Sequence, residues 1–137
     1  MGSVNVAVLV VSNKILKGLV PDKGKADLEA ICREQGMSMI SYQVIADDRE
    51  AIRDQLTNLC HAGRFQVIFT VGGTGVRPTD WAPEATRDVI DKEIPGIGEA
   101  MRAESLKKIR TAMLSRGMAG IRGKTLIVNL PGSPRGA

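Results

Sequence analysis

Aromatic side chains are scarce in this chain of 137 residues, where Phe, Trp and Tyr together make up 3%. Proteins that bind single-stranded nucleic acid usually stack its bases on aromatic rings, so this scarcity argues against nucleic acid as a partner. The hydrophobic fraction of 43% is nevertheless ordinary for a globular protein. The core must therefore be built from Val, Ile, Leu, Ala and Met, and the length suits a single domain, residues 1–137.

Histidine and cysteine are also rare, and their scarcity excludes several kinds of site. His61 is the sole histidine of the sequence, so a Ser/His/Asp hydrolase and a histidine metal site are set aside. Cys32 and Cys60 lie far apart without CxxC spacing, which favours core residues in a reducing compartment over a disulfide. Neither a signal peptide nor an apolar run of membrane-spanning length is recognisable. We therefore expect a cytoplasmic protein without a membrane partner.

The chain is mildly basic, with a formal net charge of +4. Cations are densest at Lys107, Lys108 and Arg110, followed by Arg116, Arg122 and Lys124. Such a group is either a solvated face or part of an anion-binding site, and the sequence leaves both interpretations open. Scattered cations fit a nucleotide or another phosphorylated small molecule better than they fit DNA.

Strand-like and helix-like segments alternate along the chain. Aliphatic and β-branched runs predict strands over residues 4–11, 38–45, 65–71, 111–118 and 124–130. Amphipathic segments predict helices over residues 25–35, 49–61, 83–92 and 99–108, with loops at 14–23, 94–98 and 119–123. Asp22 is expected to cap the first of these helices. The alternation predicts a three-layer α/β domain with a mostly parallel sheet.

A glycine-rich segment, Thr70–Gly75, follows one predicted strand and precedes the helix that begins at Pro83. Many proteins hold a phosphate with this layout, because glycine lets backbone N–H groups approach an anion closely. Asp80 adds a carboxylate just beyond the segment. Taken alone, the segment predicts either an anion site or a tight turn.

Three further loops are expected at the same edge of the sheet. Ser12–Asn13, Asp47–Asp48 and Pro131–Pro134 each follow a predicted strand, and parallel strands place their carboxyl ends together. The carboxylates at 47 and 48 have two interpretations, as caps of the next helix or as a group that points toward the glycine-rich segment. Together the four loops predict a ligand site.

Seven segments carry a more specific pattern: Thr70–Gly75, Asp80, Pro83–Thr86, Ile94–Gly96, Ala112–Arg116, Ala119–Gly123 and Leu130–Pro134. In order and spacing they resemble the MoaB/MogA-like molybdopterin-binding family of molybdenum cofactor biosynthesis, over nearly the whole chain. The resemblance implies a three-layer α/β/α sandwich with a mixed, mostly parallel sheet. It also implies assembly into trimers or hexamers, and association with other molybdenum cofactor enzymes.

The resemblance implies an enzyme, a nucleotidyltransferase that adenylylates molybdopterin with ATP and Mg²⁺ and releases pyrophosphate. Asp47 and Asp80 would then be the catalytic carboxylates and the metal ligands. The alternative is a non-catalytic molybdopterin-binding protein, acting as a carrier or scaffold in the same pathway. Both functions need the glycine-rich segment, but only the enzyme needs both carboxylates as working ligands.

The substrate-binding residues follow from the same resemblance. Phosphates would be cradled by Gly72, Gly73, Thr74 and Gly75, the nucleotide would lie beside Ser12, Asp22 and Gly24, and the pterin side would comprise Ser105, Ser115, Arg116, Pro131, Gly132 and Ser133. The alternative interpretation of Ser115 is a residue that forms a local hydrogen bond, and that of Arg116 is a surface cation.

The chain departs from the family pattern at three positions. Asn13 stands where relatives commonly carry Asp, which removes a charge and weighs against full catalytic competence. Ala46 and Ala82 replace a frequent proline and threonine. The family's C-terminal helix, which would follow Pro134–Ala137, is expected to be missing.

Overall fold

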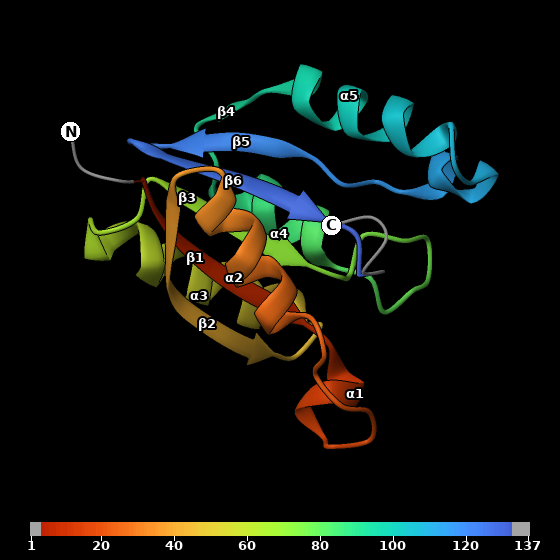
Figure 1. Ribbon diagram of the computed structural model, residues 1–137, viewed down its shortest axis with the longest axis horizontal. Coiled ribbons are helices and arrows are strands. Elements are labelled where there is room, and N and C mark those ends of the chain that lie inside the picture. The colour runs from red at the N-terminus through yellow and green to blue at the C-terminus, as the bar shows by residue number, and fades with distance from the viewer. Residues whose placement is uncertain (1–3, 133–137) are drawn as a thin grey trace.

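The computed structural model describes residues 4–132, which form a six-stranded sheet in the order β2-β1-β3-β6-β5-β4. The strands are β1 (Val4–Val11), β2 (Met37–Ile45), β3 (Val67–Val71), β4 (Lys92–Glu93), β5 (Ala119–Arg122) and β6 (Thr125–Leu130). β2, β1, β3 and β6 pair in parallel, whereas β5 and β4 pair antiparallel at one edge. The predicted mixed, mostly parallel sheet is confirmed (Figure 1).

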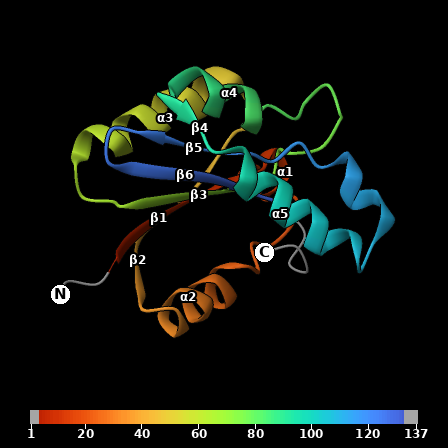
Figure 2. The ribbon, with the colours of Figure 1, turned by 90° about the horizontal axis from the view of Figure 1, so that it is seen from above.

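Helices cover both faces of the sheet, which confirms the three layers (Figure 2). α3 (Arg49–Ala62) and α4 (Ala82–Val89) lie on one face, and α2 (Lys25–Glu34) lies on the other. Leu9 of β1 packs in the core under α3 and α4, and Val8 packs in the core under α2. Residues 6–11 of β1 are buried on both faces of the sheet, which accounts for their continuous apolar run.

Three shorter or peripheral elements complete the described chain: α1 (Asn13–Leu16), α5 (Pro95–Leu106) and the 3₁₀ helix η1 (Arg110–Leu114). α1 lies in the segment predicted as a loop, and the Ser12 hydroxyl caps it by accepting the Ile15 N–H at 3.2 Å. Within the described residues no helix is long and apolar enough to cross a membrane.

The strand predicted over residues 111–118 is wrong, because η1 and a loop occupy that segment. The strand forms instead from residues 119–122, which were expected to be a connection. A Cβ on Gly120 would lie 2.6 Å from Cδ1 of Ile90. Glycine thus lets β5 pack closely on the chain after α4, a tertiary contact that no local pattern reveals.

The helix predicted over residues 83–92 ends at Val89, because Lys92–Glu93 pairs with β5 as a short edge strand. Pro95 was expected to lie in a loop, residues 94–98, that ends the preceding helix, yet it opens α5. Proline fits there since its fixed φ suits the first turn and its missing N–H would have no helical partner.

Asn129 ties the sheet to α4 beneath the glycine-rich segment. Its amide nitrogen donates to the hydroxyls of Thr70 at 2.8 Å and Thr86 at 2.9 Å, and its amide oxygen accepts the Met118 N–H at 3.2 Å. The side chains of Asn129 and the two threonines are buried. Because buried polar atoms are costly unless they are bonded, this network fixes β3, β6 and α4 relative to one another.

Asn129→Ala is expected to lower the free energy of unfolding by about 2–4 kcal/mol, since two buried hydroxyls and an N–H lose their partner. Urea denaturation followed by circular dichroism measures the loss. Asn58→Ala, at an exposed position of α3, is the matched control and should change the value by less than about 0.5 kcal/mol. Similar losses in both variants would contradict the role assigned to the network.

Candidate functional site

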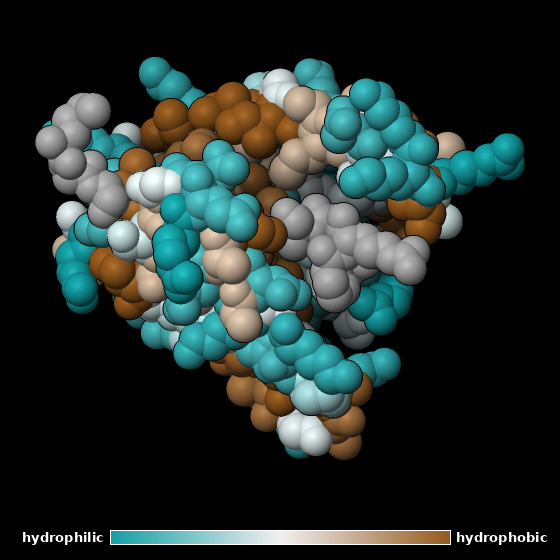
Figure 3. Space-filling view, in the orientation of Figure 1, coloured by the Kyte–Doolittle hydropathy of each residue, from teal (hydrophilic) through white to brown (hydrophobic). Residues whose placement is uncertain are grey.

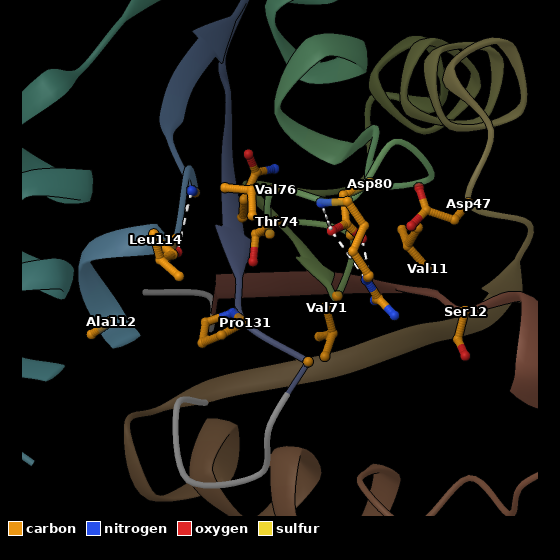
Figure 4. A pocket seen from close by; sticks show the side chains of 18 of the residues that line it. Val11, Ser12, Asp47, Val71, Thr74, Val76, Asp80, Ala112, Leu114 and Pro131 are labelled. Carbon is orange, nitrogen blue, oxygen red and sulfur yellow. Dashed lines mark hydrogen bonds and ion pairs between the residues drawn. The ribbon is translucent and has the colours of Figure 1, made fainter. Parts of the chain in front are cut away.

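The four loops at the carboxyl ends of β1, β2, β3 and β6 enclose a cavity of about 890 Å³ (Figure 4). The predicted site residues that line it are Ser12, Asp47, Gly72, Gly73, Thr74, Gly75, Asp80, Ser105, Ser115, Pro131 and Gly132. Residues of α5 and η1 supply further wall. The volume lies in the range of small-molecule sites.

The glycine-rich segment passes so close to its neighbours that side chains would not fit. A Cβ on Gly72 would lie 2.6 Å from the backbone oxygen of Val11, and a Cβ on Gly75 would lie 2.7 Å from Oδ2 of Asp80. Gly72 and Gly73 also have φ values of 95° and 69°, which L side chains rarely adopt. The glycines therefore allow the backbone itself to form the cavity wall beside a carboxylate.

The two carboxylates after β2 have different roles, so each of the two interpretations holds for one of them. The Asp48 carboxylate caps α3 by accepting the Ala51 N–H at 2.9 Å. Asp47 reaches toward the glycine-rich segment, and its Oδ1 accepts the N–H of Trp81, which follows that segment, at 3.0 Å. A Cβ on Gly73 would lie 3.1 Å from Oδ2 of Asp47.

Asp47 is held in a charged and partly buried environment. Asn13 Oδ1 accepts its backbone N–H at 2.9 Å, so the neutral residue at this position still anchors the loop. Burial raises the pKa of Asp47; the Trp81 N–H and the charge of Arg77 lower it, and the charge of Asp80 raises it. The net direction is upward, because burial, the largest influence, disfavours the charged form of the carboxylate.

Asp80 is the more buried carboxylate, with a side chain that is 1% exposed beneath an Arg77 side chain that is 73% exposed. Its Oδ2 accepts the Arg77 N–H at 3.0 Å, and its Oδ1 accepts a bond from the Arg77 guanidinium at 3.3 Å. Arg77 also lines the cavity. Figure 4 shows Asp80 and Asp47 facing the same part of the cavity.

Asp47 and Asp80 are the residues that could share a cation. Within residues 4–132 the structure contains no group of three or more His, Cys, Asp or Glu side chains able to hold a metal ion. Further ligands would thus be water or oxygen atoms of a bound substrate. Mg²⁺ is commonly held in this way, by one or two carboxylates together with phosphates, so the donor set fits Mg²⁺.

Two cations reach the cavity from α5 and the residues after it. Arg102 was not recognised from the sequence; its Nη1 donates to the backbone oxygen of Gly117 at 2.6 Å. The helical spacing could have indicated this role, because Arg102 precedes Ser105 by three residues and therefore lies on the same face of the helix. Of the predicted basic cluster, Lys108 lines the cavity, whereas Lys107 pairs with Glu104 at the surface at 3.1 Å.

Arg116 lies behind the glycine-rich segment rather than in the lining of this cavity. Its Nε donates to the backbone oxygen of Gly75 at 2.7 Å, and its Nη2 donates to that of Asp80 at 3.0 Å. The guanidinium also forms a two-point ion pair with Glu84 of α4 and, chiefly through that hydrogen bonding, lowers the pKa of Glu84. Arg116 is therefore a clamp on the loop rather than a free surface cation.

Asp22 and Gly24 line a second, smaller cavity of about 290 Å³, which shares Val10, Ile15, Val71 and Gly132 with the larger one. Asp22 does not cap α2, whose N-cap is Gly24. Its carboxylate instead accepts the Tyr42 hydroxyl at 2.7 Å, a tertiary bond across to β2. Ser133 lies outside the described residues.

Comparison with known proteins gives a consistent result. The family model of a probable molybdopterin binding domain matches residues 7–137. The molybdopterin adenylyltransferase of Helicobacter pylori strain J99 is 39% identical over 98% of this chain and 78% of that protein. Molybdenum cofactor biosynthesis protein B of Escherichia coli K12 is 36% identical over 95% of this chain and 76% of that protein. The crystal structure of MoaB, a molybdopterin biosynthesis enzyme from Thermus thermophilus, matches with a TM-score of 0.91 and 40% identity, over 98% of this chain and 84% of that one.

Asp47→Asn is expected to raise the melting temperature of the ligand-free protein by a few degrees at pH 7. The raised pKa means that the folded protein holds the Asp47 proton more tightly than the unfolded chain does, so ionisation of Asp47 lowers the stability as pH rises through the folded-state pKa. The gain should therefore fade as pH falls and be lost below about pH 4, where the carboxyl is protonated in both states.

Thermal unfolding of both proteins from pH 4 to pH 8 measures this difference. Asp54→Asn, which removes a carboxylate that is 71% exposed on α3, is the matched control and should show almost no pH-dependent gain. If the gain in melting temperature of Asp47→Asn is absent at pH 7, or grows toward acid pH, the charged Asp47 carboxylate is not destabilising in the folded protein and the interpretation is wrong.

Proposed function

The chain belongs to the molybdopterin-binding domain family, and we propose that it is a molybdopterin adenylyltransferase of molybdenum cofactor biosynthesis. One observation supports this function above all: a single cavity brings the glycine-rich segment, Asp47 and Asp80 together with the cations of α5 and the residues after it. An enzyme that joins two phosphate-bearing substrates needs such a mixture, because it must position two anions and offset their charge.

The proposed reaction transfers AMP from ATP to molybdopterin. An oxygen of the terminal phosphate of molybdopterin forms a bond to the α-phosphorus of ATP, while the bond from that phosphorus to the bridging oxygen of the β-phosphate breaks. Pyrophosphate leaves with the bonding electron pair. No covalent intermediate with the protein is needed, so the residues contribute by binding, alignment and electrostatic stabilisation.

Mg²⁺ is proposed as the cofactor, held by Asp47 and Asp80. When bound, it would neutralise charge on the phosphate oxygens. The carboxylates are placed for this by fixed partners: Trp81 N–H for Asp47, and the backbone N–H of Arg77 for Asp80.

The other residues of the cavity align the substrates. The backbone of Gly72–Gly75 is proposed to receive phosphates, and Arg116 to support that loop from behind. Ser105 and Ser115, together with Arg102, are proposed to face the pterin. Asp22 and Gly24, in the adjoining smaller cavity, are proposed to lie beside the nucleotide.

A non-catalytic molybdopterin-binding protein is the second candidate, and Asn13 is the observation that favours it. The amide keeps the hydrogen bond to the Asp47 N–H but adds no negative charge to the cation site. Such a protein would bind molybdopterin in the same cavity and transfer nothing.

A homo-oligomer, a trimer or hexamer, is proposed on the family resemblance and on the apolar surface that the monomer leaves open. Large hydrophobic side chains are exposed around α1 at Leu16 and Leu19, and around η1 at Met113 and Leu114. Figure 3 shows the apolar surface over α1. A cytoplasmic location, with other molybdenum cofactor enzymes as partners, completes the proposal and suits the free thiols of Cys32 and Cys60.

Incubation of the purified protein with molybdopterin, ATP and Mg²⁺ should yield adenylyl-molybdopterin and pyrophosphate in equal amounts. Asp80→Asn is expected to lower the rate at least about 100-fold, because a ligand of the charge-neutralising cation is lost. Its affinity for molybdopterin, measured by ultrafiltration, should stay within a few-fold of wild type. Asp54→Asn, outside the cavity, is the control that keeps its activity.

Two outcomes would decide against the enzyme. Bound molybdopterin without any adenylyl product in the wild-type protein would leave the binding protein as the function. Loss of molybdopterin binding in Asp80→Asn would show that this carboxylate serves the pterin rather than the cation.

A further inference from the structure

Arg77 and Asp80 form an ion pair between one movable and one fixed partner. The Arg77 side chain is 73% exposed and leaves no hole in the core if it turns into the solvent. Asp80 is held by its surroundings: its Oδ2 accepts the Arg77 backbone N–H, its backbone oxygen accepts a bond from Arg116, and Gly75 closes the space beside it. Any exchange of partners at Asp80 therefore moves the guanidinium and not the carboxylate.

The guanidinium is also loosely held. Its two bonds to Asp80 measure 3.3 and 3.4 Å, longer than the usual range for a charged pair. The ion pair of Arg49 with Asp88, elsewhere on the surface, measures 2.7 and 2.8 Å. The structure thus contains close two-point arginine pairs, and the pair at the cavity is not one of them.

Asp47 and Asp80 line the same part of the cavity, and two negative charges placed together repel each other. Arg77 pairs with Asp80 there; its charge lowers the pKa of Asp47, whereas the charge of Asp80 raises it. In the ligand-free protein Arg77 is thus the cation that offsets the carboxylate pair. A divalent ion bound to the same two carboxylates would offset their charge in place of Arg77.

We propose that Arg77 is an exchangeable counter-ion of Asp80, which a divalent cation displaces from the carboxylate toward the phosphates of a substrate in the cavity. The proposal rests on the proposed function in taking Asp47 and Asp80 as the cation site. Arg77 already lines the cavity, so a released guanidinium faces bound phosphates, with which arginine forms strong two-point hydrogen bonds. Cation binding and phosphate binding are coupled through one side chain.

Arg77→Gln tests the exchange directly with Mn²⁺ as the probe, titrated into ligand-free protein while free Mn²⁺ is followed by electron paramagnetic resonance. The variant should bind Mn²⁺ at least about tenfold more tightly than wild type, because a competing positive charge next to the site is gone. Arg77→Lys keeps the charge and should bind close to wild type. Arg87→Gln removes an equal charge from a surface pair with Glu93 and should change the affinity less than about twofold.

A second titration, with pyrophosphate added to protein that is saturated with Mn²⁺, should show the opposite sign: several-fold weaker binding by Arg77→Gln than by wild type and Arg87→Gln. A purely structural role of Arg77 would not shift the two affinities in opposite directions. The proposal is overturned if Arg77→Gln binds Mn²⁺ no more tightly than wild type, including the case in which neither binds it. Normal adenylyl transfer by the wild-type protein together with that result would leave the proposed function intact and remove the counter-ion role alone.

Discussion

The close approach of the glycine-rich backbone to its neighbours is the constraint on which the rest of the site depends. Gly72 packs against the carbonyl of Val11, and Gly75 packs against the carboxylate of Asp80, at separations that a Cβ would forbid. This contact sets where the cavity wall lies relative to β1. It also brings backbone N–H groups, which attract anions, next to carboxylates, which repel them. Arg77 is paired with Asp80 at this place, and its positive charge links the loop and the carboxylate pair in one arrangement.

The surrounding structure stabilises this unfavourable placement of charge. Arg116 binds the loop from behind and anchors it to Glu84 of α4, while Asn129 fastens α4 to the sheet. Arg116 thus ties the loop to α4, and Asn129 ties α4 to the sheet, so the site does not rest on loose loops. Asp47, whose pKa burial raises, is where the arrangement costs stability. Sites that must bind charge commonly give up some stability in this way.

The sequence predicts the parallel half of the fold well and the antiparallel edge poorly. β1, β3 and β6 are buried on both faces or nearly so, and their aliphatic runs identify them without tertiary information. β5 could not be predicted in this way. Its Gly120 allows close packing against Ile90, a residue that is distant in the sequence, and no local pattern indicates that contact.

The site shows the same division. Strand ends predict which loops meet, but not which side chain of a loop faces inward. Asp48 turned out to cap α3 and Asp22 to bind Tyr42, and the role of Arg116 as a clamp depends on Glu84 in another element.

Asp47 and Asp80 are proposed to share one divalent cation over the glycine-rich segment. A crystal grown with Mn²⁺ and ATP would locate this ion through the anomalous signal of Mn²⁺. One strong peak is expected, within coordination distance of an oxygen of each carboxylate and in contact with phosphate. A peak that is bound to neither carboxylate would rule out the shared cation.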